Sequence, residues 1–336
     1  MRSIALICAL SCAFAFPAAA APIVIKFSHV VAPDTPKGKA AEKFRELAQK
    51  YTKGAVEIEV YPNSQLFKDR EELEALQRGV VQMLAPSVSK FGPLGVREFE
   101  LFDLPYLFPD RETVDRVTDG EIGRKLFQKL ESRGVRGLAY WDNGFKQFSA
   151  NRPLRTLRDF RGLRMRIQSS KVLEAMIREL GAAPQVMAFS EVYTALQQGV
   201  VDGTENPVSN LYTQKMHEVQ KHLTISDHGY LVYAVVTNSR FWEGLPAAIR
   251  GQLERAMREA TAYERDIAAR ENQQALAAVR AAGRTEIYLL PAEERSRWRE
   301  ALLPVHRKFE RMVGRDNLEA IYRVAAEVEA GRSSKP

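Results

Sequence analysis

The chain has 336 residues, 49 of them basic and 42 acidic, which gives a formal net charge of +7 with 45% hydrophobic residues. This composition indicates a globular protein large enough for two lobes. Because no Lys/Arg run is interleaved with aromatic residues, nucleic acid is excluded as the expected partner. Both cysteines, Cys8 and Cys12, lie in the first 20 residues. The rest of the chain therefore offers no disulfide framework, cysteine zinc site or thiol nucleophile.

The first 20 residues have the layout of a secretory signal peptide. Arg2 gives a positive start, residues 4–16 are apolar, and small residues up to Ala20 suit cleavage. The apolar run is too short for a membrane anchor. We predict that residues 1–20 are removed and that the protein is exported to the periplasm. A lipid anchor on Cys12 is the weaker alternative, because the three residues before it fit such a site poorly.

Strands and helices alternate in the next part of the chain. Residues 23–27 read as a strand, and Pro36 suits the first position of a helix that runs to about Lys50. Residues 56–60 alternate between apolar and polar side chains, as a half-buried strand does. This alternation predicts an α/β fold with a mostly parallel sheet and helices on its faces.

One segment occurs twice. Residues 71–81 and 191–201 share the pattern Glu-x-x-x-Ala-Leu-Gln-x-Gly-Val-Val. Each copy predicts a helix that ends at a glycine, followed by a buried strand. Asp69 with Glu72 three residues later has the pattern of a capping box for the first helix. We interpret the repeat as two lobes of similar α/β build, with a ligand site between them.

A long helical stretch follows the buried-looking strand at 230–236. Residues 246–282 contain no internal proline and would form a helix of roughly 55 Å, longer than one small domain needs. A coiled coil is the alternative, but the apolar spacing is not sustained. We predict that this helix ties the two lobes together. A strand at 286–289 and two helices after Pro291 would complete the second lobe.

The usual signatures of catalysis are missing from the sequence. There is no Gly-x-Ser-x-Gly elbow and no phosphate-binding Gly-rich loop. His217 and His222 resemble a zinc-protease helix, but histidines five apart do not share a helix face. No carboxylate pair for acid–base chemistry stands out. We therefore predict no catalytic residue, no metal and no cofactor.

The stretch from Arg152 to Pro207 points to binding of an anion. A short strand carries two arginines, Arg164 and Arg166, and a guanidinium can pair with a carboxylate at two points. Asn206, just before Pro207 at an expected helix start, would add neutral donors. No nucleophile with a base accompanies them. The residues therefore favour capture of an anion over its chemical conversion.

This stretch resembles the substrate-binding proteins of tripartite ATP-independent periplasmic (TRAP) transporters, of the DctP type. The resemblance rests on residues 162–167 (GLRMRI), 187–193 (MAFSEVY) and 201–207 (VDGTENP), and it extends over most of the chain. It implies the two-lobe periplasmic binding protein fold, with an interlobe ligand cleft and a long helix bridging both lobes. The ligand implied is a small organic acid.

Four residues of the second lobe take their expected roles from this resemblance. It implies that Arg166 grips the ligand carboxylate, that Arg152 assists, and that Asn206 donates from the same lobe. Many relatives have a proline after the strand, where this chain has Gln168. That departure would add a donor beside the arginine.

The first lobe looks like that of family members that take four-carbon dicarboxylates. The similarity lies in FSHVV, TPKG and LFKD, at residues 27–31, 35–38 and 66–69. A dianion needs a second cationic end. Candidate groups for that end are Lys37, Lys68, Ser87 and Lys90.

The resemblance divides the chain into two lobes and suggests a partner. Lobe I would contain residues 21–149 and 232–271, and lobe II residues 150–231 and 272–330. The expected ligand is malate, succinate or fumarate, and the expected partner is the membrane permease of the transporter. Two alternatives remain at this stage. One is a different organic acid (a 2-oxoacid, sugar acid or aromatic acid), and the other is a ligand-presenting sensor that docks on a receptor kinase.

Overall fold

The computed structural model describes residues 21–333, so the predicted signal peptide lies outside the described part of the chain. The strands are β1 (Ile23–Ser28), β2 (Val56–Tyr61), β3 (Met83–Leu84), β4 (Val135–Ala150), β5 (Arg164–Ile167), β6 (Ala183–Val186), β7 (Gly203–Asn206), β8 (His222–Asn238) and β9 (Glu286–Leu289). The helices are α1 (Pro36–Tyr51), α2 (Glu72–Gln77), α3 (Arg111–Asp119), α4 (Glu121–Glu131), α5 (Lys171–Glu179), α6 (Val192–Gln197), α7 (Val208–Thr213), α8 (Ser239–Gly244), α9 (Ala247–Ala282), α10 (Ala292–Val313) and α11 (Arg315–Ser333). Short 3-10 helices are η1 (Val88–Phe91), η2 (Arg97–Asp103), η3 (Leu157–Phe160), η4 (Phe189–Glu191) and η5 (Met216–Glu218).

A single sheet runs through the molecule in the order β2-β1-β3-β8-β4-β7-β5-β6, with β9 paired to β8. At one end, β1 pairs in parallel with β2 and β3, and at the other β5 pairs in parallel with β6 and β7. Between them, the long strands β4 and β8 pair antiparallel. The prediction of a mostly parallel sheet therefore holds at the two ends and is wrong in the middle. The reason is that β4 and β8 cross between the ends in opposite directions.

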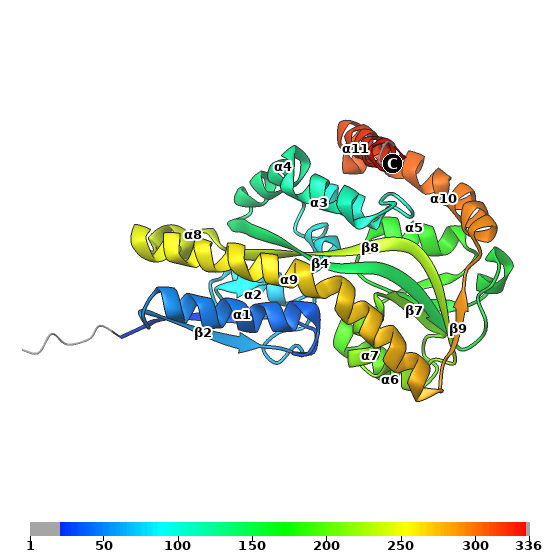
Figure 1. The fold of residues 1–336 in the computed structure, drawn as a ribbon, viewed down its shortest axis with the longest axis horizontal. Helices are drawn as coiled ribbons and strands as arrows, with labels where there is room; N and C mark the ends of the chain where they lie inside the picture. The colour runs from blue at the N-terminus through cyan, green and yellow to red at the C-terminus, as the bar shows by residue number, and fades with distance from the viewer. Residues whose placement is uncertain (1–20, 334–336) are drawn as a thin grey trace, which may run out of the picture.

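Each end of the sheet has its own helices, and we call the end with β1–β3 the first lobe and the end with β5–β7 the second lobe (Figure 1). The core of the first lobe includes Ile25, Phe44 and Trp141 between the sheet, α1 and α9. In the second lobe, Val208 and Val279 belong to a separate cluster beneath α6 and α7. Two lobes of α/β build were predicted, and this arrangement confirms them.

The predicted long helix is α9, whose 36 residues end at Ala282 and are followed by Gly283 in the left-handed conformation (φ 65°). One part of α9 packs on α1 and another part on α7, so it bridges the lobes (Figure 1). Asn272 ties it to the sheet, because its Nδ2 donates to the Asn143 carbonyl (2.7 Å) and its Oδ1 accepts from the Ser209 N–H (3.0 Å). The helix thus braces the molecule along its length.

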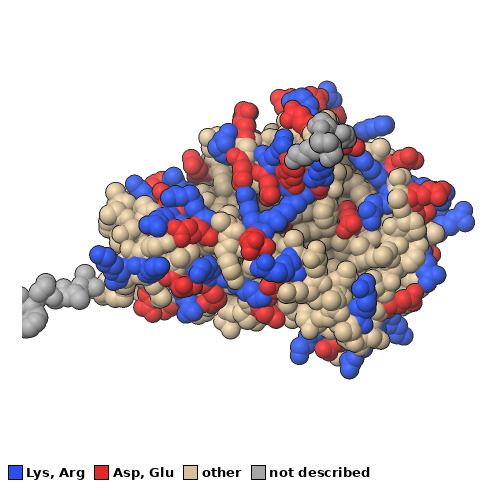
Figure 2. Space-filling view, in the orientation of Figure 1, with Lys and Arg blue, Asp and Glu red and all other residues tan. Residues whose placement is uncertain are grey.

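The C-terminal helices touch elements of both lobes. Helix α10 packs on α5, and α11 packs on α3. The assignment of residues 272–330 to one lobe, like the other lobe boundaries, stays a prediction. Lys and Arg side chains alternate with Asp and Glu over the visible face, as the mixed sequence charges lead one to expect (Figure 2). Within residues 21–333, none of the helices combines the length and apolar character of a membrane span.

The repeated segment forms α2 and α6, and the glycine that follows each helix is left-handed, with φ of 75° at Gly79 and 68° at Gly199. The next residue of each copy is on the surface: Val80 is 53% and Val200 is 49% exposed. The strands begin only at Met83 and Gly203. The expectation of a buried strand directly after the glycine was wrong, because the chain first turns back towards the sheet.

Candidate functional site

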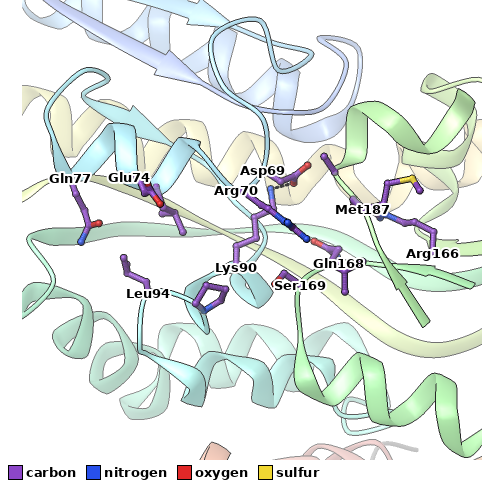
Figure 3. Close-up of a pocket in the computed structure, with 14 residues that line it drawn as sticks. Asp69, Arg70, Glu74, Gln77, Lys90, Leu94, Arg166, Gln168, Ser169 and Met187 are labelled. Atoms are coloured by element: carbon purple, nitrogen blue, oxygen red, sulfur yellow. Dashed lines mark hydrogen bonds and ion pairs between the residues drawn. The ribbon is translucent and has the colours of Figure 1, made fainter. Parts of the chain in front are cut away.

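Two adjoining cavities lie between the lobes and share Asp69, Lys90, Arg166 and Gln168 in their walls. The outer one has a volume of about 490 Å³ (Figure 3). The inner one has a volume of about 20 Å³ and is lined by Val30, Val31, Asp69, Ser87, Lys90, Arg166, Gln168, Phe189, Asn206, Asn210, Leu231 and Tyr233. The inner cavity has room for about one water molecule. The lobes or side chains must therefore move apart before an organic acid fits there.

Arg166 lies in the wall of both cavities. It comes from β5, which is enclosed between β6 and β7, and it is 2% exposed. The Met187 carbonyl accepts from its Nε (3.1 Å) and Nη2 (2.8 Å), and the guanidinium lies 5.6 Å from the Phe189 ring centroid. Burial lowers the pKa of Arg166, and nearby carboxylates oppose that change. Since arginine stays charged in proteins, the cavity wall contains a fixed cation.

The first lobe places a second cation opposite. Lys90 comes from η1, is 6% exposed, and forms an ion pair with Asp69 (Figure 3) and another with Glu72 (Nζ–Oε1 3.0 Å). Burial lowers the pKa of Lys90, but the two carboxylates raise it more, so the net change is upward. Lys90 is therefore charged. The structure brings the predicted Lys90 and Arg166 into the wall of one cavity.

Asp69 joins the two lobes and does not cap a helix. Its Oδ2 accepts from the Phe189 N–H of the second lobe (2.6 Å), while its Oδ1 pairs with Lys90. Helix α2 begins at Glu72, with no side-chain cap at Glu71. The predicted capping box is therefore wrong. The reason is that the Asp69 carboxylate is held across the cleft by an amide and an ammonium group.

Lys37 lies directly behind the inner cavity. It is 1% exposed, donates to the Ala85 carbonyl (2.8 Å), and its Nζ lies 3.7 Å from the centroid of the Tyr233 ring, which lines the cavity. Burial, with a smaller contribution from Lys90, lowers the pKa of Lys37 to about 7. Lys37 therefore acts on the cavity through the Tyr233 ring and not as part of its wall.

The other candidates occupy different parts of the cleft. Lys68 is half exposed and pairs with Glu191 of the second lobe (2.8 Å), outside the inner cavity. Ser87, Gln168 and Asn206 line the inner cavity. The Asn206 Nδ2 donates to Thr204 Oγ1 (3.3 Å), which fixes the amide at the end of β7. The site thus contains neutral donors from both lobes.

Arg152 is not brought to the cleft. Its side chain is exposed, donates to the carbonyls of Asp159 (3.0 Å) and Arg161 (2.6 Å), and lines a separate surface hollow. Strand β4 ends at Ala150, so Arg152 already lies in the loop beyond the sheet. The expectation that Arg152 assists at the anchor does not fit this geometry.

A buried charge cluster, which sequence reasoning missed, lies on the central strands. Lys146 of β4 is 1% exposed and pairs with Glu205 (3.1 Å) and Asp103 (3.5 Å). His228 of β8 lies 3.6 Å from the same Glu205 carboxylate. Burial raises the pKa of Glu205, but Lys146 and His228 lower it more, so the net change is downward. Because Glu205 precedes Asn206, the cluster supports the floor of the cleft.

Comparisons with known proteins agree with this geometry. The family model described as bacterial extracellular solute-binding protein, family 7 (DctP), matches residues 27–312. This chain belongs to that family. A C4-dicarboxylate-binding periplasmic protein DctP from Rhodobacter capsulatus is 64% identical over 319 residues, which cover 95% of this chain and 96% of the relative.

Two solved structures resemble this solute-binding protein over most of its length. A TRAP periplasmic solute-binding protein from Shewanella oneidensis, with bound succinate, has a TM-score of 0.89 and 44% identity and covers 91% of this chain and 100% of its own. A TRAP periplasmic solute-binding protein from Pseudomonas aeruginosa, with bound L-malate, has a TM-score of 0.83 and 45% identity. It covers 85% of this chain and 100% of its own. These likenesses confirm the two-lobe fold with an interlobe cleft.

The site of this solute-binding protein is built for holding an anion. Charged and neutral donors face one small space between the lobes, which is the arrangement that recognises carboxylates. Among residues 21–333, no group of three or more His, Cys, Asp or Glu side chains is arranged to hold a metal ion. Contact between a ligand and any individual residue stays a prediction.

Proposed function

We propose that this protein captures a four-carbon dicarboxylate such as succinate, malate or fumarate, and delivers it unchanged to the membrane permease of a TRAP transporter. The observation that carries the proposal is the pair of cations, Arg166 and Lys90, which face one inner cavity from opposite lobes. A diacid has a carboxylate at each end, so one molecule would engage both lobes. The dicarboxylate-binding relatives reported above support this assignment.

The energetics require both ends of the ligand. A carboxylate 4 Å from a guanidinium gains about 4 kcal/mol at an effective dielectric constant near 20. Micromolar binding needs about 8 kcal/mol, and desolvation removes part of the Coulomb gain. One ion pair is therefore insufficient. Two charged ends, with neutral donors such as Ser87 and Asn206 between them, supply the remainder.

We further propose that the protein works in the periplasm and is not an enzyme. Support for the location comes from the signal-peptide pattern at residues 1–20 and from the periplasmic relative. Support for simple capture comes from the family, whose members are described as solute-binding proteins. Recovery of unaltered succinate after prolonged incubation with the protein would agree with capture. Conversion of the acid would contradict it.

A thermal-shift screen tests the ligand class. We expect succinate, L-malate and fumarate to raise the melting temperature by roughly 5 °C at a hundredfold excess over Kd, because a ligand that binds only the folded state adds about 2.7 kcal/mol. Acetate and butyrate, which have one carboxylate, are the matched controls and should have little effect. A shift with a sugar acid or aromatic acid, and none with the diacids, would instead favour the alternative ligands.

The Arg152→Gln variant tests the placement of that residue. We expect its affinity for succinate in calorimetry to stay within about twofold of the wild type, because an exposed surface charge contributes little. A loss of tenfold or more would show that Arg152 reaches the ligand in another conformation.

A further inference from the structure

The first lobe has a compact group of ionisable side chains behind the inner cavity, which we call the lysine–carboxylate cluster: Lys37, Asp69, Glu72 and Lys90. Lys90 lies in the middle, paired with both Asp69 and Glu72. Asp69 is almost buried, and Glu72 is 1% exposed. The cation that faces the cavity from this lobe is therefore already neutralised by two carboxylates.

Other charged or titratable groups surround the cluster on every side. The second lobe contributes Arg166 from β5, Glu191 from η4 and Glu205 from β7, while α9 contributes Glu264. His29 and Tyr233 are the neutral groups beside Lys37. At the cavity itself, Arg166 and Lys90 are balanced by Asp69 and Glu72. The addition of a dianion would leave this buried space with a net negative charge, even with Lys37 charged.

A buried excess of negative charge is costly, and binding of a proton relieves it. Glu72 is the group best placed to accept that proton. Its Oε1 accepts from Lys90, while its Oε2 is buried and has no hydrogen-bond partner among the described residues. Asp69 has both carboxylate oxygens engaged, by Lys90 and by the Phe189 N–H. When a ligand carboxylate draws Lys90 towards the cavity, Glu72 loses its partner and Asp69 does not.

We propose that the cleft takes up a proton with each dicarboxylate dianion, and that this proton binds to the Glu72 carboxylate. The inference rests on the proposed function, because it needs a ligand with two negative charges. Burial already raises the pKa of Glu72 in the unliganded protein, and a nearby dianion raises it further. Since the bound state holds more protons than the free state, affinity must fall as the pH rises.

Calorimetry with fumarate measures the uptake directly. Fumarate is a strong enough acid to stay a dianion at about pH 6. Lys37, whose pKa is about 7, is already mostly protonated at that pH, so the remaining uptake reports on Glu72. The binding enthalpy is measured in cacodylate and in bis-tris, which have different heats of ionisation. We expect an uptake of roughly half to one proton per ligand, and an affinity that falls by up to about tenfold per pH unit between the pKa of Glu72 in the free protein and its higher pKa in the complex.

Two variants of neighbouring residues assign the proton. Glu72→Gln, which keeps the shape but cannot titrate, should lose the uptake at about pH 6 and bind fumarate at least as tightly as the wild type at neutral pH. Glu71→Gln is the matched control, because Glu71 is exposed, lies next to Glu72 in the chain and lines neither cavity, and it should keep the uptake. If Glu72→Gln does not fold, the wild-type measurement in two buffers still decides whether a proton is taken up.

The possible failures are distinguishable. Binding without uptake, or with proton release, would overturn this inference and leave the proposed function intact. Uptake that persists in Glu72→Gln would overturn the assignment to Glu72. No binding of any four-carbon diacid, by calorimetry or thermal shift, would count against the proposed function itself. If succinate alone binds, the same measurement is made with succinate after correction for its own ionisation.

Discussion

Replacing Arg166 by alanine will abolish dicarboxylate binding while leaving the fold intact. The guanidinium is buried, fixed by the Met187 carbonyl and present in the wall of both cavities, so no other residue of β5 can replace it. Loss of a buried charge-assisted pair costs about 3–5 kcal/mol, or roughly a hundredfold to several-thousandfold in Kd. Calorimetry with succinate measures the loss, and circular dichroism checks the fold.

Two further variants show whether the effect comes from the guanidinium fork. Arg166→Lys keeps the charge but not the two-point geometry, so we expect an intermediate loss. Arg164→Gln removes an arginine two residues away that is half exposed and pairs with Asp202 (2.8 Å), and it should bind normally. Full affinity in a folded Arg166→Ala variant would remove the basis for the proposed anchor.

The largest loss of stability should follow the Lys146→Met change. Methionine has a similar shape, but it leaves Glu205 and Asp103 as buried carboxylates without their cation. Breaking a buried ion pair in this way costs about 3–5 kcal/mol. For a chain of this length, the melting temperature should fall by roughly 5–10 °C in differential scanning calorimetry. Lys125→Met, which breaks a largely exposed pair with Glu121, is the control and should change stability by less than about 1 kcal/mol.

The pH dependence of this loss has a definite sign. In the wild type the pKa of Glu205 is lowered on balance, so its contribution to stability is present at neutral pH and is lost as the pH falls. In Lys146→Met the ammonium is gone, and the pKa of Glu205 rises. At low pH these unpaired carboxylates become protonated, so the variant no longer contains buried unpaired charges and its loss of stability becomes smaller. The difference in melting temperature should narrow between about pH 7 and pH 4. A difference that widens in acid would contradict the charge explanation.

The sequence predicted most of the local structure, because the relevant signals are short-range. Pro36 marked the start of α1, Gly79 and Gly199 marked the ends of α2 and α6, and the proline-free stretch predicted α9. Arg166 was found because motif residues on both sides of it identify β5.

The parts that the sequence did not predict depend on contacts between distant residues. Arg152 was assigned to the site by the family resemblance, but β4 ends just before it, at Ala150, and its side chain donates to loop carbonyls instead. The cluster around Lys146 joins residues from η2, β4, β7 and β8, which are up to 125 positions apart, and no local pattern marks them. The place of Lys37 behind the wall of the inner cavity is set by Tyr233, which is far away in the sequence. No local pattern around Lys37 could indicate this contact.

The central β4–β8 pair limits how the two lobes can move. Its register shifts between Gly137 and Ala139, between Asp142 and Gly144, and between Lys146 and Phe148. Each irregularity lets a paired ribbon change its curvature without giving up the neighbouring backbone hydrogen bonds. Because one continuous sheet runs through both lobes, any separation of the lobes has to bend this strand pair. Asn272 fastens α9 to β4 beside Gly144, so the helix has to move together with the sheet.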